Sequence, residues 1–76
     1  MKDIKLIDTI VVTYFHENKN KIDEVRLRQI LEESLEIEIG SVKLEGDTLM
    51  IYYGPKAKRK KVIFEIHNDK IKHRKE

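Results

Sequence analysis

The sequence predicts an α+β fold: two N-terminal helices packed on one face of a three- to four-stranded antiparallel β-meander, in two layers. Three observations predict it. Apolar residues recur with a helical period up to about residue 35, they alternate with polar residues over 37–73, and separate turn signals define one common core face. With 76 residues and no cysteine, the chain 1–76 is expected to form a single domain without disulfides or thiolate metal ligands.

Residues 3–16 set helical periodicity against strand propensity. Segment 9–15 is rich in β-branched and aromatic residues, which favour strands. Yet the apolar side chains fall within one half of a helical wheel, with only Val12 misplaced: Ile4, Leu6, Ile7, Ile10, Val11, Tyr14 and Phe15. Asp3 is a suitable N-cap. We predict a helix here, and the alternative is a first strand near residues 10–15.

A second helix is predicted from about Asp23 to Leu35. The polar connection before it, residues 17–21, contains asparagines, which can adopt the left-handed conformation that ends a helix. Asp23 can cap the second helix. Its apolar stripe consists of Leu27, Ile30, Leu31 and Leu35. So short a connection favours an antiparallel helical hairpin.

The remaining chain alternates as strands. The alternation slips at residues 40–41, and a glycine at such a slip suggests a bulge. Residues 46–47 form a Gly-Asp pair typical of a two-residue hairpin turn, which sets Leu44 opposite Leu49.

Two further turns complete the predicted meander. A turn around residues 57–58 would set Tyr53 opposite Val62, and one at residues 68–69 would allow a short fourth strand at about 70–73. The registers that these turns set place the same side chains on one core face. This agreement is strong evidence for the meander, because a one-residue slip would turn the apolar side chains of a strand to the opposite face. That face carries Val42, Leu44, Leu49, Ile51, Tyr53, Val62, Phe64 and Ile66.

The connection at residues 54–61 is the most informative feature for function. It carries five cationic side chains in six residues: Lys56, Lys58, Arg59, Lys60 and Lys61. Clustered lysine and arginine on a loop between two strands can neutralise phosphates and release counterions. Further charge could come from Lys72, Arg74 and Lys75 in the tail. The alternative is a solvated hairpin tip that blocks edge-to-edge aggregation.

Charge is divided unevenly along the chain. Residues 1–50 hold seven basic and eleven acidic residues, a net charge of −4, whereas residues 51–76 hold nine and three, a net charge of +6. Such a division predicts a polyanionic partner for the basic half. Alternatively, an acidic helical layer simply complements a basic sheet layer.

The outer face of the predicted sheet carries Lys43, Met50, Tyr52, Ile63, Glu65 and His67. Met50, Tyr52 and Ile63 are too apolar for a solvated face, and so small a core favours oligomerisation. We therefore predict that they form an interface in a homodimer or with a protein partner. Tyr52 could instead stack on unpaired bases, but a single exposed tyrosine makes a poor stacking surface.

Motifs for catalysis or metal binding do not converge. His67 and His73 point to opposite faces in the predicted hairpin, His16 lies on the polar side of the first helix, and metal ligands must share one centre. Ser34 and Ser41 lack a local histidine, and no glycine-rich phosphate loop occurs. We predict no enzyme activity, metal, cofactor or small-molecule substrate.

The longest uncharged run, residues 9–15, is far shorter than the ~20 apolar residues that a membrane span needs. The N-terminus has no signal-peptide pattern, so the sequence predicts a cytoplasmic protein without a membrane partner.

The predicted function of the protein is non-enzymatic and non-specific binding of nucleic acid, DNA or RNA, through the basic hairpin loop. Such a protein would be an accessory or regulatory factor, including one of a mobile element or virus. The alternative is a protein–protein interaction module or inhibitor acting through the apolar outer face.

Overall fold

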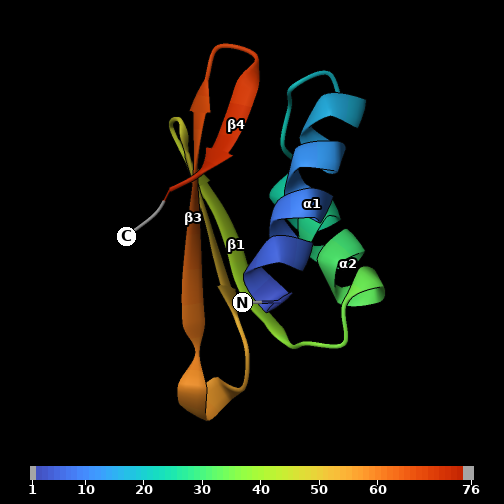
Figure 1. The fold of residues 1–76 in the computed structure, drawn as a ribbon, viewed down its shortest axis with the longest axis vertical. Coiled ribbons are helices and arrows are strands. Elements are labelled where there is room, and N and C mark those ends of the chain that lie inside the picture. Colours follow the sequence, from blue (N-terminus) through green and yellow to red (C-terminus); the bar gives the residue numbers. More distant parts are fainter. Residues whose placement is uncertain (1, 75–76) are drawn as a thin grey trace.

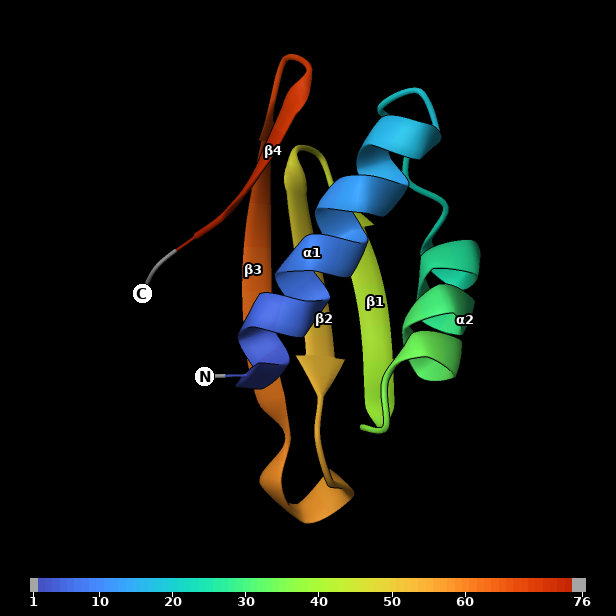
Figure 2. The ribbon, with the colours of Figure 1, turned by 45° about the vertical axis from the view of Figure 1, so that its right-hand side comes forward.

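Two helices precede a four-stranded antiparallel sheet in the computed structural model, which describes residues 2–74 and their side chains from Ile4 onward. The elements are α1 (Lys2–Glu17), α2 (Glu24–Ser34), β1 (Ile39–Glu45), β2 (Thr48–Tyr53), β3 (Lys60–His67) and β4 (Lys70–His73), with a single 3₁₀ turn, η1 (Lys56–Lys58), between β2 and β3. The strands lie in the order β1-β2-β3-β4, which is a meander. Both helices lie on one side of the sheet (Figure 1), with α2 beside β1 and α1 across the face (Figure 2). The predicted fold class is confirmed.

Helical periodicity prevails over strand propensity in α1. Its buried side chains lie on one face and pack into the core between the layers: Ile7, Val11, Tyr14 and Phe15. Packing of this face stabilises the helix more than the intrinsic preference of β-branched residues opposes it. Leu6 is 51% exposed and Val12 is partly buried, so the buried face is rotated slightly from the predicted one. The helix begins at Lys2, before the predicted cap Asp3, whose side chain lies outside the described residues.

The connection between the helices adopts the predicted left-handed ending. Lys19 and Asn20 have φ values of 56° and 63°, and the Asn20 N–H donates to the Phe15 carbonyl at 2.9 Å. Asp23 caps α2 as predicted, since its carboxylate accepts from the backbone N–H groups of Val25 (3.0 Å) and Arg26 (3.3 Å).

Most of the predicted sheet register is confirmed. Leu44 pairs with Leu49, the register shifts between Ile39 and Ser41 as expected for a bulge, and β4 exists. The predicted register between β2 and β3 was wrong by two residues, because Tyr53 pairs with Lys60 rather than with Val62. The 3₁₀ turn closes the connection earlier than a simple turn at residues 57–58 would. A shift of two preserves which side chains face the core.

The core lies between the sheet and the helices. Every strand contributes to it: Ile39, Val42, Leu49, Ile51, Tyr53, Val62, Phe64 and Ile71 are buried in one cluster with the helical residues. Leu44 and Ile66, also predicted for this face, are partly buried against the cluster. Within the described part of the chain, no helix is both long and apolar enough to cross a membrane.

Candidate nucleic-acid interface

The basic loop, residues 54–61, is held in one shape by its backbone. Gly54 has a φ of 95°, and its N–H donates to the Glu38 carbonyl at 2.8 Å. The Lys58 N–H donates to the Pro55 carbonyl at 2.8 Å and closes the 3₁₀ turn. Lys56 and Lys58 are therefore presented, exposed, at the end of the hairpin (the orange tip in Figures 1 and 2).

Arg59 occupies a different position from the lysines around it. Its Nη1 donates to the Gly54 carbonyl at 2.6 Å and to Glu38 Oε2 at 3.3 Å, and its side chain is 26% exposed. The side chain also lies against Gly40, where a Cβ atom would come within 2.8 Å of Arg59 Nε. Arg59 therefore ties the basic loop to the bulge of β1.

Lys60 and Lys61 begin β3 and point to opposite faces of the sheet, because successive strand residues alternate. Lys61 lies opposite Tyr52 on the outer face, and Lys60 lies opposite Tyr53 on the helical side. Both lysines are exposed. Together with the two lysines of the 3₁₀ turn, they surround the hairpin end with positive charge.

The tail residues lie farther along the outer face. Lys72 pairs with Glu65, while the Arg74 N–H donates to the Ile63 carbonyl at 2.8 Å, so Arg74 lies nearer the basic loop by register. Arg74 Nη2 also donates to Glu65 Oε2 at 2.7 Å. Part of the tail charge is thus balanced locally. Lys75 lies outside the described residues.

The three predicted interface residues share the outer face but differ in exposure. Met50 pairs with Ile63, and Tyr52 lies two residues along β2 from Met50. Ile63 is only 7% exposed, while Met50 and Tyr52 are half-buried. The apolar surface that this face offers is therefore mostly Met50 and Tyr52.

A shallow depression of about 400 Å³ adjoins the basic loop on the outer face. It is lined by Gly40, Ser41, Lys43, Tyr52 and Arg59. Sequence reasoning did not single out Ser41 or Lys43 as binding residues. Their proximity to Arg59 depends on the predicted bulge and on the folding back of the arginine onto Gly54 and Glu38, and the second of these has no signal in the local sequence.

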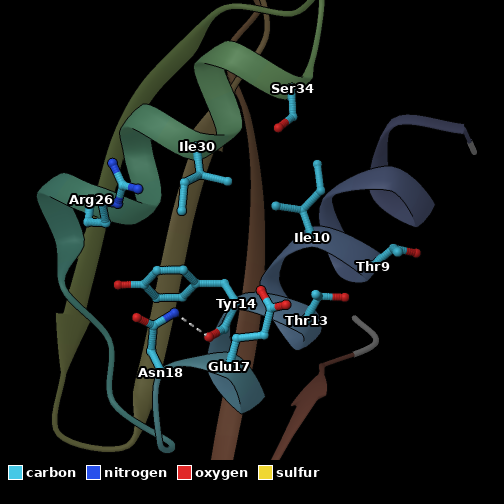
Figure 3. Close-up of a pocket in the computed structure, with 9 residues that line it drawn as sticks. All are labelled: Thr9, Ile10, Thr13, Tyr14, Glu17, Asn18, Arg26, Ile30 and Ser34. Atoms are coloured by element: carbon cyan, nitrogen blue, oxygen red, sulfur yellow. Dashed lines mark hydrogen bonds between the residues drawn. The ribbon is translucent and has the colours of Figure 1, made fainter.

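A second depression, of about 360 Å³, lies between the two helices (Figure 3). Two of its polar side chains bond at the helix ends. The Tyr14 hydroxyl accepts from the Asp23 N–H at 3.1 Å, and Asn18 Nδ2 donates to the Tyr14 carbonyl at 2.8 Å. Tyr14 and Asn18 therefore help to hold the connection between the helices.

The histidines are dispersed. The His73 ring packs near the Phe64 ring, with centroids 5.7 Å apart, and His67 and His16 are exposed. Among the residues that the structure describes, no group of three or more histidine, cysteine or acidic side chains could hold a metal ion.

Arg74 holds the pKa of Glu65 below its ordinary value of 4.5, through its hydrogen bond and then its charge. Because the pKa is lowered in the folded state, the Glu65–Arg74 pair favours folding above the unfolded-state pKa, and this contribution is lost as the pH falls through the folded-state pKa.

We expect Arg74→Gln to raise the pKa of Glu65 towards 4.5, as followed by NMR titration of the carboxyl carbon. Arg28→Gln, which breaks the Arg28–Glu32 pair on α2, should leave the Glu65 pKa unchanged. An unchanged Glu65 pKa in Arg74→Gln would contradict the pairing.

Comparison of the chain with protein-family models, with curated proteins and with solved structures finds no match. Fold and site together describe a two-layer α+β protein with an exposed cationic hairpin beside a shallow depression.

Proposed function

We propose that this protein binds nucleic acid, without enzymatic activity and without sequence preference, through the lysines of its basic loop. The observation that carries the proposal is the group of four exposed lysines at one hairpin end: Lys56, Lys58, Lys60 and Lys61. The phosphodiester backbone of nucleic acid suits such a group, because each neutralised phosphate releases condensed counterions. We propose that a protein with this activity serves as an accessory or regulatory factor acting on DNA or RNA.

The shape of the basic loop supports the proposal. The Gly54 N–H bond to Glu38 and the Arg59 bonds to Gly54 and Glu38 fix the loop before a ligand arrives. A preformed loop loses less conformational entropy on binding than a mobile one does. A tip whose only task is solubility has no need of such anchoring.

A protein partner on the outer face has less support. Its apolar surface is small because Ile63 is nearly buried. Homodimerisation through this face stays a prediction from the sequence.

The test compares two variants that remove the same charge. Lys56→Ala with Lys58→Ala, and Lys5→Ala with Lys21→Ala, each take the formal net charge from +2 to 0, and all four lysines are exposed. Fluorescence anisotropy with a duplex DNA over a salt series gives the slope of log K against log salt. For the loop variant we expect weaker binding and a slope reduced by up to about 1.8, since each lost phosphate contact removes ~0.9.

The control variant, with lysines removed from α1 and from the connection between the helices, should bind with nearly the original slope. Equal slopes for the loop and control variants would overturn the proposal, because net charge and not the basic loop would then govern binding. Matched RNA and DNA oligonucleotides in the same series identify the preferred polymer.

A further inference from the structure

We infer that the outer face of the sheet next to the basic loop binds an unpaired nucleotide, with the base stacked on Tyr52, so that single-stranded nucleic acid is the preferred ligand. This inference rests on the proposed function and specifies its ligand. Tyr52 is not the isolated tyrosine that the sequence suggested, because the structure places it beside Ser41, Lys43 and Lys61.

Tyr52 lies on an inner strand with polar and cationic neighbours on both sides. Ser41 of β1 and Lys61 of β3 lie directly opposite it on the same face, and Lys43 is its diagonal neighbour on β1. Directly opposite side chains have Cβ atoms ~4.5–5.5 Å apart, and diagonal neighbours are ~7–8 Å apart, within reach of long side chains. Two lysines can therefore reach a phosphate attached to a nucleotide that rests on the Tyr52 ring.

The depression beside Tyr52 offers space for such a nucleotide. Its volume of about 400 Å³ falls within the ~300–1,000 Å³ range of small-ligand pockets. The lining combines an aromatic ring, the Ser41 hydroxyl and the cations Lys43 and Arg59. Single-strand binding proteins use the same two elements, a cationic groove for the backbone and aromatic rings for the bases.

On the outer face, carboxylates lie at the end away from the basic loop, where Glu65 is paired with Lys72 and bonded to Arg74. Two of the carboxylates on this face, Glu45 and Glu65, both pair with Thr48, at the opposite end of β2 from Tyr52. Near the loop, Glu38 is already bonded to Arg59. A phosphate chain that leaves the basic loop therefore finds Lys61 and Lys43 beside Tyr52 before it meets Glu45 or Glu65.

The depression is open and shallow, which favours a base that has left its stack. In a duplex the faces of the bases are covered by their neighbours, whereas an unpaired base presents a free face. The basic loop can contact phosphates of either form. Tyr52 therefore adds affinity for the single strand alone.

The experiment measures affinity for a fluorescein-labelled oligothymidylate, an oligouridylate and a duplex of the same length. We expect Tyr52→Ala to weaken single-strand binding about tenfold, within the range measured for loss of one stacked base, and to leave duplex binding unchanged. Tyr52→Phe keeps the ring and should keep single-strand affinity. Thr48→Ala, on the same face of β2 but distant from the loop, is the matched control and should bind like the unaltered protein.

A spectroscopic readout tests stacking directly. The chain has no tryptophan, so Tyr52→Trp introduces a single reporter at the site. Its emission should be quenched by oligothymidylate and not by an abasic oligonucleotide of equal length. Circular dichroism melts verify that each variant is folded.

Equal losses of single-strand and duplex affinity in Tyr52→Ala, or no loss in either, would overturn the inference. Equal quenching by the abasic oligonucleotide would do the same. The loop variant decides the proposed function separately. If Lys56 and Lys58 govern affinity while Tyr52 does not, the protein binds phosphates without stacking; if neither does, both proposals are wrong.

Discussion

Replacing Phe64 by alanine is expected to lower the free energy of unfolding by about 3–5 kcal/mol, the range found for large-to-small changes in protein cores. Phe64 is completely buried on an inner strand, where it pairs with Leu49 on one side and His73 on the other. Removing its ring would leave a cavity between the sheet and the helices. A domain of this length is stable by only about 4–11 kcal/mol, so the loss would be a large part of the total.

Urea unfolding followed by circular dichroism measures this effect. A loss of that size also lowers Tm by more than about 12 °C in so small a domain. Leu6→Ala is the matched control, since Leu6 is a large apolar side chain that is half exposed on α1. It should cost less than about 1 kcal/mol. Similar losses for Phe64→Ala and Leu6→Ala would mean that the core does not lie where the fold places it.

Gly54→Ala is expected to cost about 1–3 kcal/mol and to release the basic loop from its position. A φ of 95° is rarely adopted by residues with a Cβ atom, and strain of this kind costs ~1–3 kcal/mol. The added Cβ would also lie 3.3 Å from the carbonyl oxygen of Lys58, which is backbone and cannot turn away. Relief of the strain would move the 3₁₀ turn that carries Lys56 and Lys58.

Unfolding by urea and amide hydrogen exchange at Lys58 measure the two parts of this prediction. The Lys58 N–H bond to the Pro55 carbonyl closes the turn, so its exchange should accelerate. Gly46→Ala is the control, because Gly46 also has a positive φ (58°) but a Cβ there would meet no atom within 4 Å. We expect a smaller cost in Gly46→Ala and no change in exchange at Lys58. An equal cost at the two glycines, with protection at Lys58 retained, would refute the role of Gly54.

Local signals predicted the cap of α2 and the first hairpin turn, because such signals act over a few residues. Asp23 caps α2 through its own carboxylate and two nearby amides, and the Gly46-Asp47 pair turns the first hairpin as expected. The register between β2 and β3 was predicted wrongly because local signals do not determine it. Its connection is closed by a 3₁₀ turn and by Arg59 bonded across to Glu38, and an interaction between residues so distant in sequence leaves no periodic pattern.

Part of the candidate site could likewise be predicted from local sequence, and part of it could not. The clustered lysines could be identified from the sequence, because charge is a property of the side chain itself. The different position of Arg59 was not visible, and neither was the near burial of Ile63 on a face expected to be open. Both depend on which neighbours the folded chain supplies.

The order of the elements, the core face and the cationic character of the hairpin were determined by the sequence alone. These properties follow from periodicity, turn chemistry and charge, which each residue carries with it in any surroundings. Only the tertiary structure decided that Arg59 anchors the loop, and that Ser41, Lys43 and Tyr52 share one depression. The reason is physical: burial and proximity are relations between segments, and they exist only once the bulge of β1 and the end of the β2–β3 hairpin have been brought together.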